Sequence, residues 1–190
     1  LEKNTGKTEC LNYILRRLSG YPLRVGVTSI GVDGEKVDQV TQSSKPEIFL
    51  QEGIIFSTSE KHYRERKLFS ELLDVDDSQT SLGRICTARV LGYGNVLLSG
   101  PSRTSSLINW IKTLKSKYSV DLCIVDGALS RLSPASPAVS ESMILATGAA
   151  LSSNIPELVN KTHFITELIS IPRTKVISEG FVPESGVWKI

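Results

Sequence analysis

The chain has 190 residues, of which 40% are hydrophobic, and its 22 basic and 20 acidic residues leave a formal net charge of +2. This length and composition are typical of one globular domain with a continuous core, and they exclude a disordered or fibrous chain. Basic and acidic residues are mixed along the sequence, which argues against nucleic acid as the main partner. No stretch approaches the roughly 18 consecutive apolar residues of a membrane span. We therefore predict a single cytoplasmic domain over residues 1–190, with neither nucleic acid nor membrane as a partner.

The first motif in the chain is Asn4-Thr5-Gly6-Lys7-Thr8, which runs directly into an amphipathic helix. Gly-Lys-Thr at the start of a helix is the core of the Walker A phosphate-binding loop. In such a loop a glycine lets backbone N–H groups turn toward phosphate, and the helix N-terminus adds partial positive charge. We expect Lys7 to reach the β- and γ-phosphates of a nucleotide and the Thr8 hydroxyl to bind Mg²⁺. These five residues are the predicted cofactor site.

The Walker A motif is incomplete on its N-terminal side. The full pattern has a glycine five residues before Gly6, where this sequence has Leu1, and a strand normally leads into the loop. Because the sequence also begins without Met, we expect a further N-terminal segment that carries the first strand and the first glycine. Gly-Lys-Thr alone is common in solvent-exposed loops, but the helical pattern that follows favours a nucleotide site. The apolar stripe of that helix consists of Cys10, Leu11, Ile14, Leu15 and Leu18.

Strand-like and helical patterns alternate along the rest of the chain. Glycines at positions 92 and 94 indicate a hairpin or bulge between two of the strands. The helix expected over residues 60–73 would turn Tyr63, Leu68, Phe69, Leu72 and Leu73 inward. In chain order we predict a strand at 23–30, a strand at 54–56, a helix at 60–73, strands at 84–91 and 95–99, a helix at 104–118, strands at 120–125 and 143–147, a helix at 156–169 and a strand at 175–178.

Near-continuous apolar strands separated by helices are typical of a parallel sheet that is covered on both faces. We therefore predict a three-layer α/β domain with a mainly parallel sheet and a P-loop NTPase fold, whose first strand is missing from the given residues. In such sheets ligands bind beyond the carboxyl ends of the strands. Residues that directly follow a strand are consequently the best candidates for the site.

Asp126 ends the apolar run of residues 120–125, and Gly127 follows it. This arrangement has the form of a Walker B motif, in which a buried strand delivers a carboxylate that orients Mg²⁺ or its water shell. The alternative interpretation is an aspartate that caps a turn after a strand. Given the Gly-Lys-Thr upstream, we favour the metal role for Asp126.

A second acid, Asp33, lies in the loop after the strand expected at 23–30. Asp33 could complete the Mg²⁺ shell or position an attacking water, with Thr28 and Glu35 as nearby alternatives, or it could be a turn residue before a glycine. The predicted catalytic residues are thus Lys7, Asp33 and Asp126, and the predicted Mg²⁺ ligands are Thr8, Asp126 and Asp33. The chain contains no Asn-Lys-x-Asp guanine-reading motif, so ATP is favoured over GTP.

Other polar or reactive residues have simpler interpretations. The loop before residue 104 could bind an anion or a partner, or Ser102 could cap the following helix. Gly148, in the string Thr147-Gly148-Ala149-Ala150 after a predicted strand, lets a backbone approach closely, for instance to a nucleotide base. We interpret the three cysteines, Cys10, Cys86 and Cys123, as small core residues. We interpret the two histidines, His62 and His163, as ordinary helix residues.

Several strings, taken together in this order, resemble one family: the small P-loop subunit of the lysine 5,6-aminomutase reactivase, the KamB-type proteins. The resemblance spans most of the chain, and its Asp-Gly-Glu and Asp-Gly-Ala strings are more selective than the widely shared Walker string. The strings are 3–8 followed by Leu11-Asn12, then 28–35, 45–48, 125–128 with Ser136-Pro137, and 145–149.

This resemblance implies an Mg²⁺-dependent ATPase that works with a second reactivase subunit to rescue an adenosylcobalamin-dependent aminomutase after its cofactor is damaged. By position, Lys7 and Thr8 match the phosphate and Mg²⁺ residues of the family, and Asp126 matches its Walker B acid. A second interpretation is a small-molecule P-loop enzyme, either a kinase or an enzyme similar to dethiobiotin synthetase. A third is a structural subunit that does not hydrolyse nucleotide, and homodimer formation is left open.

Overall fold

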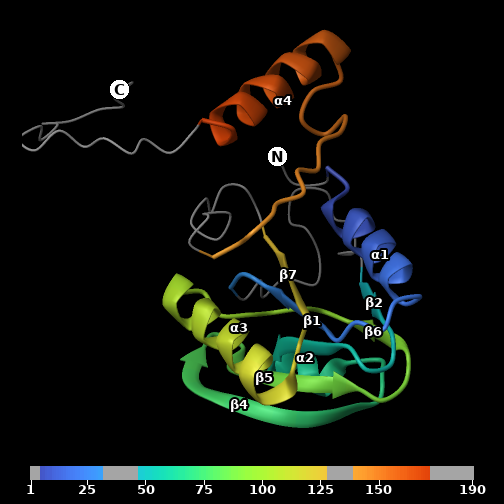
Figure 1. Cartoon of the computed structure of the whole chain (residues 1–190), viewed down its shortest axis with the longest axis vertical. Helices are drawn as coiled ribbons and strands as arrows, with labels where there is room; N and C mark the ends of the chain where they lie inside the picture. The colour runs from blue at the N-terminus through green and yellow to red at the C-terminus, as the bar shows by residue number, and fades with distance from the viewer. Residues whose placement is uncertain (1–4, 32–46, 128–138, 172–190) are drawn as a thin grey trace, which may run out of the picture.

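The structure is a computed structural model, and it describes residues 5–31, 47–127 and 139–171 of the chain (Figure 1). Its main sheet has five strands in the order β4-β5-β3-β1-β7, and a separate two-stranded sheet pairs β2 with β6. The elements are α1 (Lys7–Leu18), β1 (Val25–Ser29), β2 (Ile48–Leu50), β3 (Ile55–Ser59), α2 (Glu60–Glu65), β4 (Ser70–Thr80), β5 (Gly83–Val90), β6 (Gly94–Val96), α3 (Thr104–Tyr118), β7 (Leu122–Asp126) and α4 (Ile155–Ile169).

The main sheet is mixed rather than uniformly parallel. Strand β1 pairs in parallel with both β3 and β7, whereas β5 pairs antiparallel with β3 and with β4. The parallel strands are therefore those that precede the candidate site loops, and the antiparallel ones form the far side of the sheet. The predicted α/β architecture is confirmed in this coarser form.

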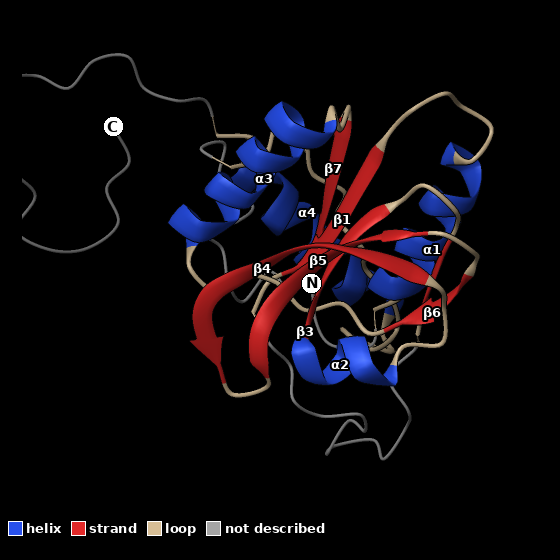
Figure 2. Cartoon of the chain, turned by 90° about the horizontal axis from the view of Figure 1, so that it is seen from below, coloured by secondary structure: helices blue, strands red, loops and turns tan. Residues whose placement is uncertain are grey.

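Helices cover opposite faces of the parallel strands, as the three-layer prediction requires (Figure 2). On one face Leu11 and Leu15 of α1 pack in a cluster with Val25 and Val27 of β1. On the other face α3 approaches β1 so closely that a Cβ on Gly26 would lie 2.6 Å from Leu114 Cδ1. The alternation of side chains along β1 thus separates two apolar layers.

The helix predicted at residues 60–73 is only half correct. Helix α2 ends at Glu65, and the chain continues in extended conformation into β4. The side chain of Leu68 is buried, as predicted, but Phe69 and Leu72 are 81% and 48% exposed. Pairing of β4 with β5, which begins at Ser70, overrides the helical spacing of these apolar residues because ladder hydrogen bonds and cross-strand contacts outweigh a weak local preference.

The hairpin of the sheet lies between β4 and β5, not around Gly94 as expected. Strand β5 confirms the strand predicted at 84–91. Strand β6 does not pair with β5; it pairs antiparallel with β2 in the separate two-stranded sheet. A Cβ on Gly94 would lie 2.1 Å from the Lys67 carbonyl oxygen. The backbone at Lys67 therefore leaves no room for a side chain at residue 94. The turn into β5 uses Gly83, whose φ of +88° is favourable for glycine.

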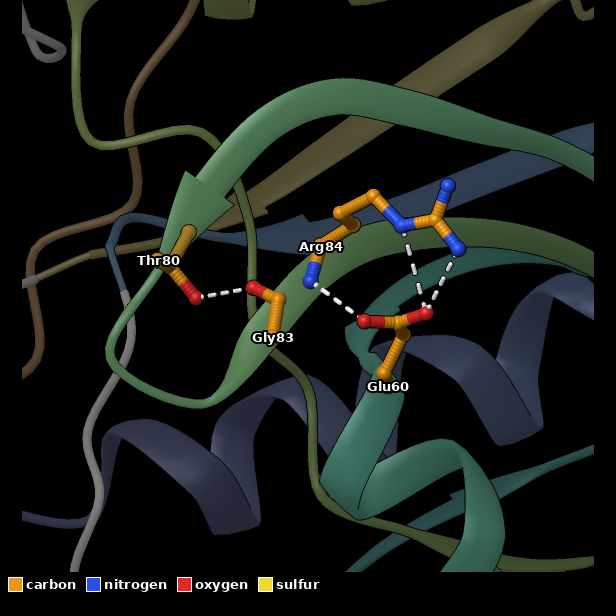
Figure 3. A network of polar contacts seen from close by, with 4 residues as sticks. All are labelled: Glu60, Thr80, Gly83 and Arg84. Atoms are coloured by element: carbon orange, nitrogen blue, oxygen red, sulfur yellow. Dashed lines mark hydrogen bonds and ion pairs between the residues drawn. The ribbon is translucent and has the colours of Figure 1, made fainter.

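Glu60 ties helix α2 to this hairpin (Figure 3). Its carboxylate accepts hydrogen bonds from the Arg84 backbone N–H at 2.9 Å and from the Arg84 guanidinium at 2.9 and 3.3 Å. The Thr80 hydroxyl closes the turn by donating to the Gly83 carbonyl oxygen. The backbone and guanidinium donors of Arg84 hold the pKa of Glu60 below its usual value.

The C-terminal third departs most from the predictions. The strand predicted at 120–125 is present as β7, but it is only half-buried and lies at the edge of the sheet. Residues 143–147 do not form the predicted strand, because an apolar run becomes a strand only when a neighbouring strand pairs with it. The helix predicted at 156–169 is confirmed as α4, and the strand predicted at 175–178 lies outside the described residues. Within the described ranges, no helix combines the length and the apolar character needed to cross a bilayer.

Candidate functional site

Gly6 turns the chain into α1 in a left-handed backbone conformation. Its φ of +84° lies in the left-handed region that favours glycine, and it occupies the N-cap position of the helix. Its carbonyl oxygen accepts a hydrogen bond of 2.9 Å from the Cys10 N–H. Thr5 before it is buried, whereas Lys7 and Thr8 in the first turn are half-buried. The predicted helix start is therefore confirmed, and Asn4 lies outside the described residues.

Lys7 and Asp126 line one groove, which has a volume of about 430 Å³. Lys7 is the first residue of α1, and Asp126 is the last residue of β7, whose carboxyl end lies beside that of β1. The Asp126 carbonyl oxygen accepts a hydrogen bond of 3.1 Å from the Ile30 N–H, which fixes the end of β7 against the end of β1. The structure thus brings two of the three predicted catalytic residues to the same groove.

The remaining predicted Mg²⁺ residues are only partly placed. Asp33 and its alternative Glu35 lie outside the described residues, and Thr8 is not among the residues that line the groove. The other alternative, Thr28, is wrong: its hydroxyl is fully buried, lies 2.5 Å from the Ser57 hydroxyl and donates to the Ser29 carbonyl oxygen. Among the described residues, no three His, Cys, Asp or Glu side chains cluster as metal ligands. A magnesium site built from Thr8, Asp33 and Asp126 remains a prediction.

The loop that leads into α3 crosses the carboxyl end of β1. The Gly100 N–H donates to the Gly31 carbonyl oxygen at 3.1 Å, and a Cβ on Gly100 would lie 1.9 Å from the Ser29 carbonyl oxygen. The N-cap of α3 is Arg103, without a side-chain hydrogen bond, so the predicted capping role of Ser102 is wrong. This loop is held by backbone contacts and leaves no room for a side chain at residue 100.

A buried network of hydroxyl groups and one histidine lies behind this loop. His62 is 3% exposed, and its Nδ1 lies 3.0 Å from the Ser99 hydroxyl. The Ser57 hydroxyl donates to the Ser99 carbonyl oxygen at 2.7 Å, and Ser59 caps α2 by accepting from the His62 N–H at 3.3 Å. The interpretation of His62 as an ordinary helix residue therefore missed its position in the interior.

One signal in the sequence pointed to this network. Three consecutive polar residues, 57–59, continue the apolar strand predicted at 54–56, and all three are fully buried in β3. Buried hydroxyl groups need hydrogen-bond partners, so such a run in a strand indicates a polar cluster in the core. The partners themselves lie far along the chain and had no local pattern.

Gly148 lies beside the loop that begins α1, at an ordinary van der Waals distance that leaves room for a Cβ. A Cβ on Gly148 would lie 3.7 Å from the Thr5 carbonyl oxygen. The segment around Gly148 therefore contacts the loop that begins α1. Contact of this segment with a nucleotide base remains a prediction.

The three cysteines are free thiols, of which Cys86 is buried and Cys10 and Cys123 are half-buried. Burial raises the pKa of the Cys86 thiol, and it raises the pKa of Cys123 to about 11. Both thiols are therefore protonated near neutral pH, as expected for small core residues rather than nucleophiles.

The chain matches no protein-family model, no curated protein and no solved structure. The chemistry of the site is consequently argued from the Gly6 turn, the Lys7 and Asp126 side chains and the strand ends that hold them. This geometry suits an anion at the start of α1 with a carboxylate nearby.

Proposed function

We propose that the protein binds and hydrolyses ATP with Mg²⁺. The observation that supports this most directly is the left-handed Gly6 at the start of α1, followed at once by Lys7, which shares a groove with Asp126. A glycine turn, a helix N-terminus and a lysine provide backbone donors and positive charge for phosphates. A carboxylate at a strand end provides the opposite charge that attracts Mg²⁺.

Two features of the groove favour a slow, partner-activated ATPase over a kinase. Its lining in the described part of the chain contains lysines and carboxylates but no histidine that could deprotonate an acceptor hydroxyl. Much of the lining is apolar, with Ile111, Ile144 and Leu145 among its residues, which does not suit a polar metabolite. Activation by a group supplied from a partner is an established route to rapid hydrolysis in P-loop proteins.

The cellular role that we propose is reactivation of an adenosylcobalamin-dependent aminomutase together with a second reactivase subunit. The support for this role is the resemblance carried by the strings at 28–35 and 125–128. A damaged cofactor must leave a closed enzyme, so nucleotide binding or hydrolysis has to favour one of two conformations of a loop or interface. The sequence predicts the segment from Asp33 to Ser44, which follows a strand end, as the part of the chain that switches conformation.

Phosphate release, measured with each component omitted in turn, tests this proposal. The full-length protein alone should hydrolyse ATP slowly. Addition of both the second subunit and the inactivated aminomutase should raise the rate by about a thousandfold or more if an electrophilic residue is supplied in trans. A rate that does not respond to any cobalamin enzyme of the host would contradict the reactivase role, and rapid phosphorylation of a metabolite by this chain alone would favour the kinase interpretation.

A further inference from the structure

Four large side chains form an exposed surface between the main sheet and the two-stranded sheet. They are Phe49 in β2, Phe69 directly before β4, Leu91 directly after β5 and Tyr93 directly before β6. Phe69 and Tyr93 are 81% and 77% exposed, Leu91 is 55% exposed and Phe49 is 39% exposed. We call these four residues the aromatic surface.

The members of the aromatic surface lie next to one another. The ring centroids of Phe49 and Tyr93 are 6.1 Å apart. The Leu91 N–H donates to the Phe69 carbonyl oxygen at 2.9 Å, which extends the ladder of β4 and β5 by one pair and places these two residues opposite each other. A Cβ on Gly92 would lie 3.9 Å from Phe69 Cδ2, so the Phe69 ring lies beside the turn that carries Tyr93. The four side chains therefore make one contiguous patch.

The size of the aromatic surface matches the apolar part of a stable interface. An aromatic side chain can bury about 200 Å² and an aliphatic one about 100 Å², so at their exposed fractions the four side chains present about 450 Å². An interface of standard size buries about 800 Å² per partner, of which about 450–500 Å² is apolar. Monomeric proteins rarely expose a contiguous apolar patch of this size unless it has a function.

Charged side chains beside the aromatic surface are paired within the chain. The Arg89 guanidinium donates to Glu71 at 3.2 Å, and Glu71 lies two residues after Phe69, on the same face of β4. Lys67 Nζ donates to Glu47 Oε1 at 2.8 Å. Because each acid is paired with a base, these charges neither repel a second copy of the chain nor select an oppositely charged partner.

We propose that the aromatic surface is the interface of a homodimer, in which it packs against the same surface of a second copy of this chain about a two-fold axis. In such an interface both partners contribute the same patch, so the patch must be complementary to itself. Apolar side chains flanked by neutral ion pairs meet this condition. The groove of Lys7 and Asp126 follows β7, at the other edge of the main sheet from β4, so the dimer leaves it accessible. This inference does not rest on nucleotide binding.

Sedimentation velocity of the full-length protein without nucleotide, over a range of concentrations, tests the inference. The wild type should have the mass of two chains. Phe69→Ser and Tyr93→Ser should each raise the dissociation constant at least about thirtyfold, as expected for central aromatic residues of an interface. Both side chains are mostly exposed, so the variants should keep the fold, which far-UV circular dichroism checks.

Phe164→Ser is the matched control. Phe164 is also an exposed aromatic residue, 62% accessible, but it belongs to α4, which lies at the opposite end of the molecule from β4 and β5 (Figure 1). This variant should dimerise as the wild type does, because it removes the same apolar side chain from outside the aromatic surface.

Three results would overturn the inference. A wild type with the mass of one chain at every concentration would leave the aromatic surface to a different protein. Dissociation constants of Phe69→Ser and Tyr93→Ser equal to that of the wild type would place the interface elsewhere. A mass that keeps growing beyond two chains would indicate head-to-tail contacts rather than a two-fold pair. Because no nucleotide is added, failure here is distinguishable from failure of the proposed ATPase activity.

Discussion

Lys7 and Asp126 line the same groove, although the first opens α1 and the second ends β7. A cation at a helix start and a carboxylate at a strand end are the two charges that a nucleotide with its metal ion needs. The groove joins them because β7 lies beside β1 and α1 packs on the face of β1. The predictions below test this pair of residues first and then the structure that holds it.

The first prediction concerns the Lys7 ammonium. ATP with Mg²⁺ at about a hundredfold above its dissociation constant should stabilise the full-length protein by about 2.7 kcal/mol. Lys7→Ala should remove most of this gain, because it deletes the charge that meets the phosphates. Chemical denaturation with and without nucleotide measures the difference. Lys112→Ala, at an exposed position of α3, is the matched control and should keep the gain.

The second prediction concerns the carboxylates. Asp126→Asn should leave folding intact but weaken the magnesium-dependent part of nucleotide binding, since the amide keeps the shape and loses the charge. Asp33→Asn should reduce turnover more than affinity if that residue positions water or the switch loop. Titrations with and without Mg²⁺, alongside Asp77→Asn as an exposed control, separate these effects. Wild-type affinity and turnover in both variants would make the two acids structural turn residues.

The third prediction concerns the loop over the end of β1. Gly100→Ala should destabilise the fold by about 1–3 kcal/mol or more, because the new Cβ would lie 1.9 Å from the Ser29 carbonyl oxygen and the backbones would have to separate. Gly20→Ala is the control, since a Cβ there meets nothing within 4 Å. Urea unfolding should show Gly20→Ala neutral or stabilised by up to about 1 kcal/mol. Equal midpoints for both variants would contradict the close approach.

How far the sequence predicted the fold depended on where each element found its partners. Helices α1, α3 and α4 were predicted to within a residue or two, because their apolar stripes and end signals are local. The helix expected at 60–73 failed because its second half pairs with β5, a contact that no local pattern reveals. The strand expected at 143–147 failed because no described strand lies beside it.

The parts of the candidate site that depend on short motifs were predicted, and the parts that depend on distant contacts were not. The Gly6 turn and the strand-end position of Asp126 follow from short motifs, and the structure has both. The polar run at 57–59 indicated a buried polar cluster, but its partners Thr28 and His62 could not be predicted, since they join it through hydrogen bonds to residues 57 and 99 in distant segments. Such contacts arise from tertiary packing rather than from residue spacing.

The fourth prediction concerns this buried network. Ser99→Ala should cost about 1–3 kcal/mol of unfolding free energy, because His62 Nδ1 loses the hydroxyl at 3.0 Å in a site that water does not reach. Ser102→Ala, three residues along the same loop and exposed, should lie within about 0.5 kcal/mol of the wild type. Thermal and denaturant unfolding of the two variants give the comparison. Equal stability would mean that the Ser99 hydroxyl contributes nothing to the core.

The fifth prediction concerns pH. The Arg84 backbone and guanidinium donors lower the pKa of Glu60 in the folded protein below its usual value. The stabilisation from Glu60 is therefore present above the pKa of the unfolded state and is lost as pH falls through the lower, folded pKa. Glu60→Gln should flatten the loss of stability below about pH 4.5, whereas Glu52→Gln, in the exposed turn before β3, should not. If wild type and Glu60→Gln lose the same unfolding free energy as the pH falls, the contact between Glu60 and Arg84 does not contribute to stability.

Equilibrium dialysis of the full-length protein against ATP and Mg²⁺, with Lys7→Ala as the paired variant, tests the central claim most directly. The account predicts saturable binding of one nucleotide per chain to the wild type. It predicts much weaker binding to the variant, whose unfolding without nucleotide matches that of the wild type. Failure of the wild type to bind either ATP or GTP, or equal binding by the two proteins, would contradict the assignment of the site to Lys7 and Asp126.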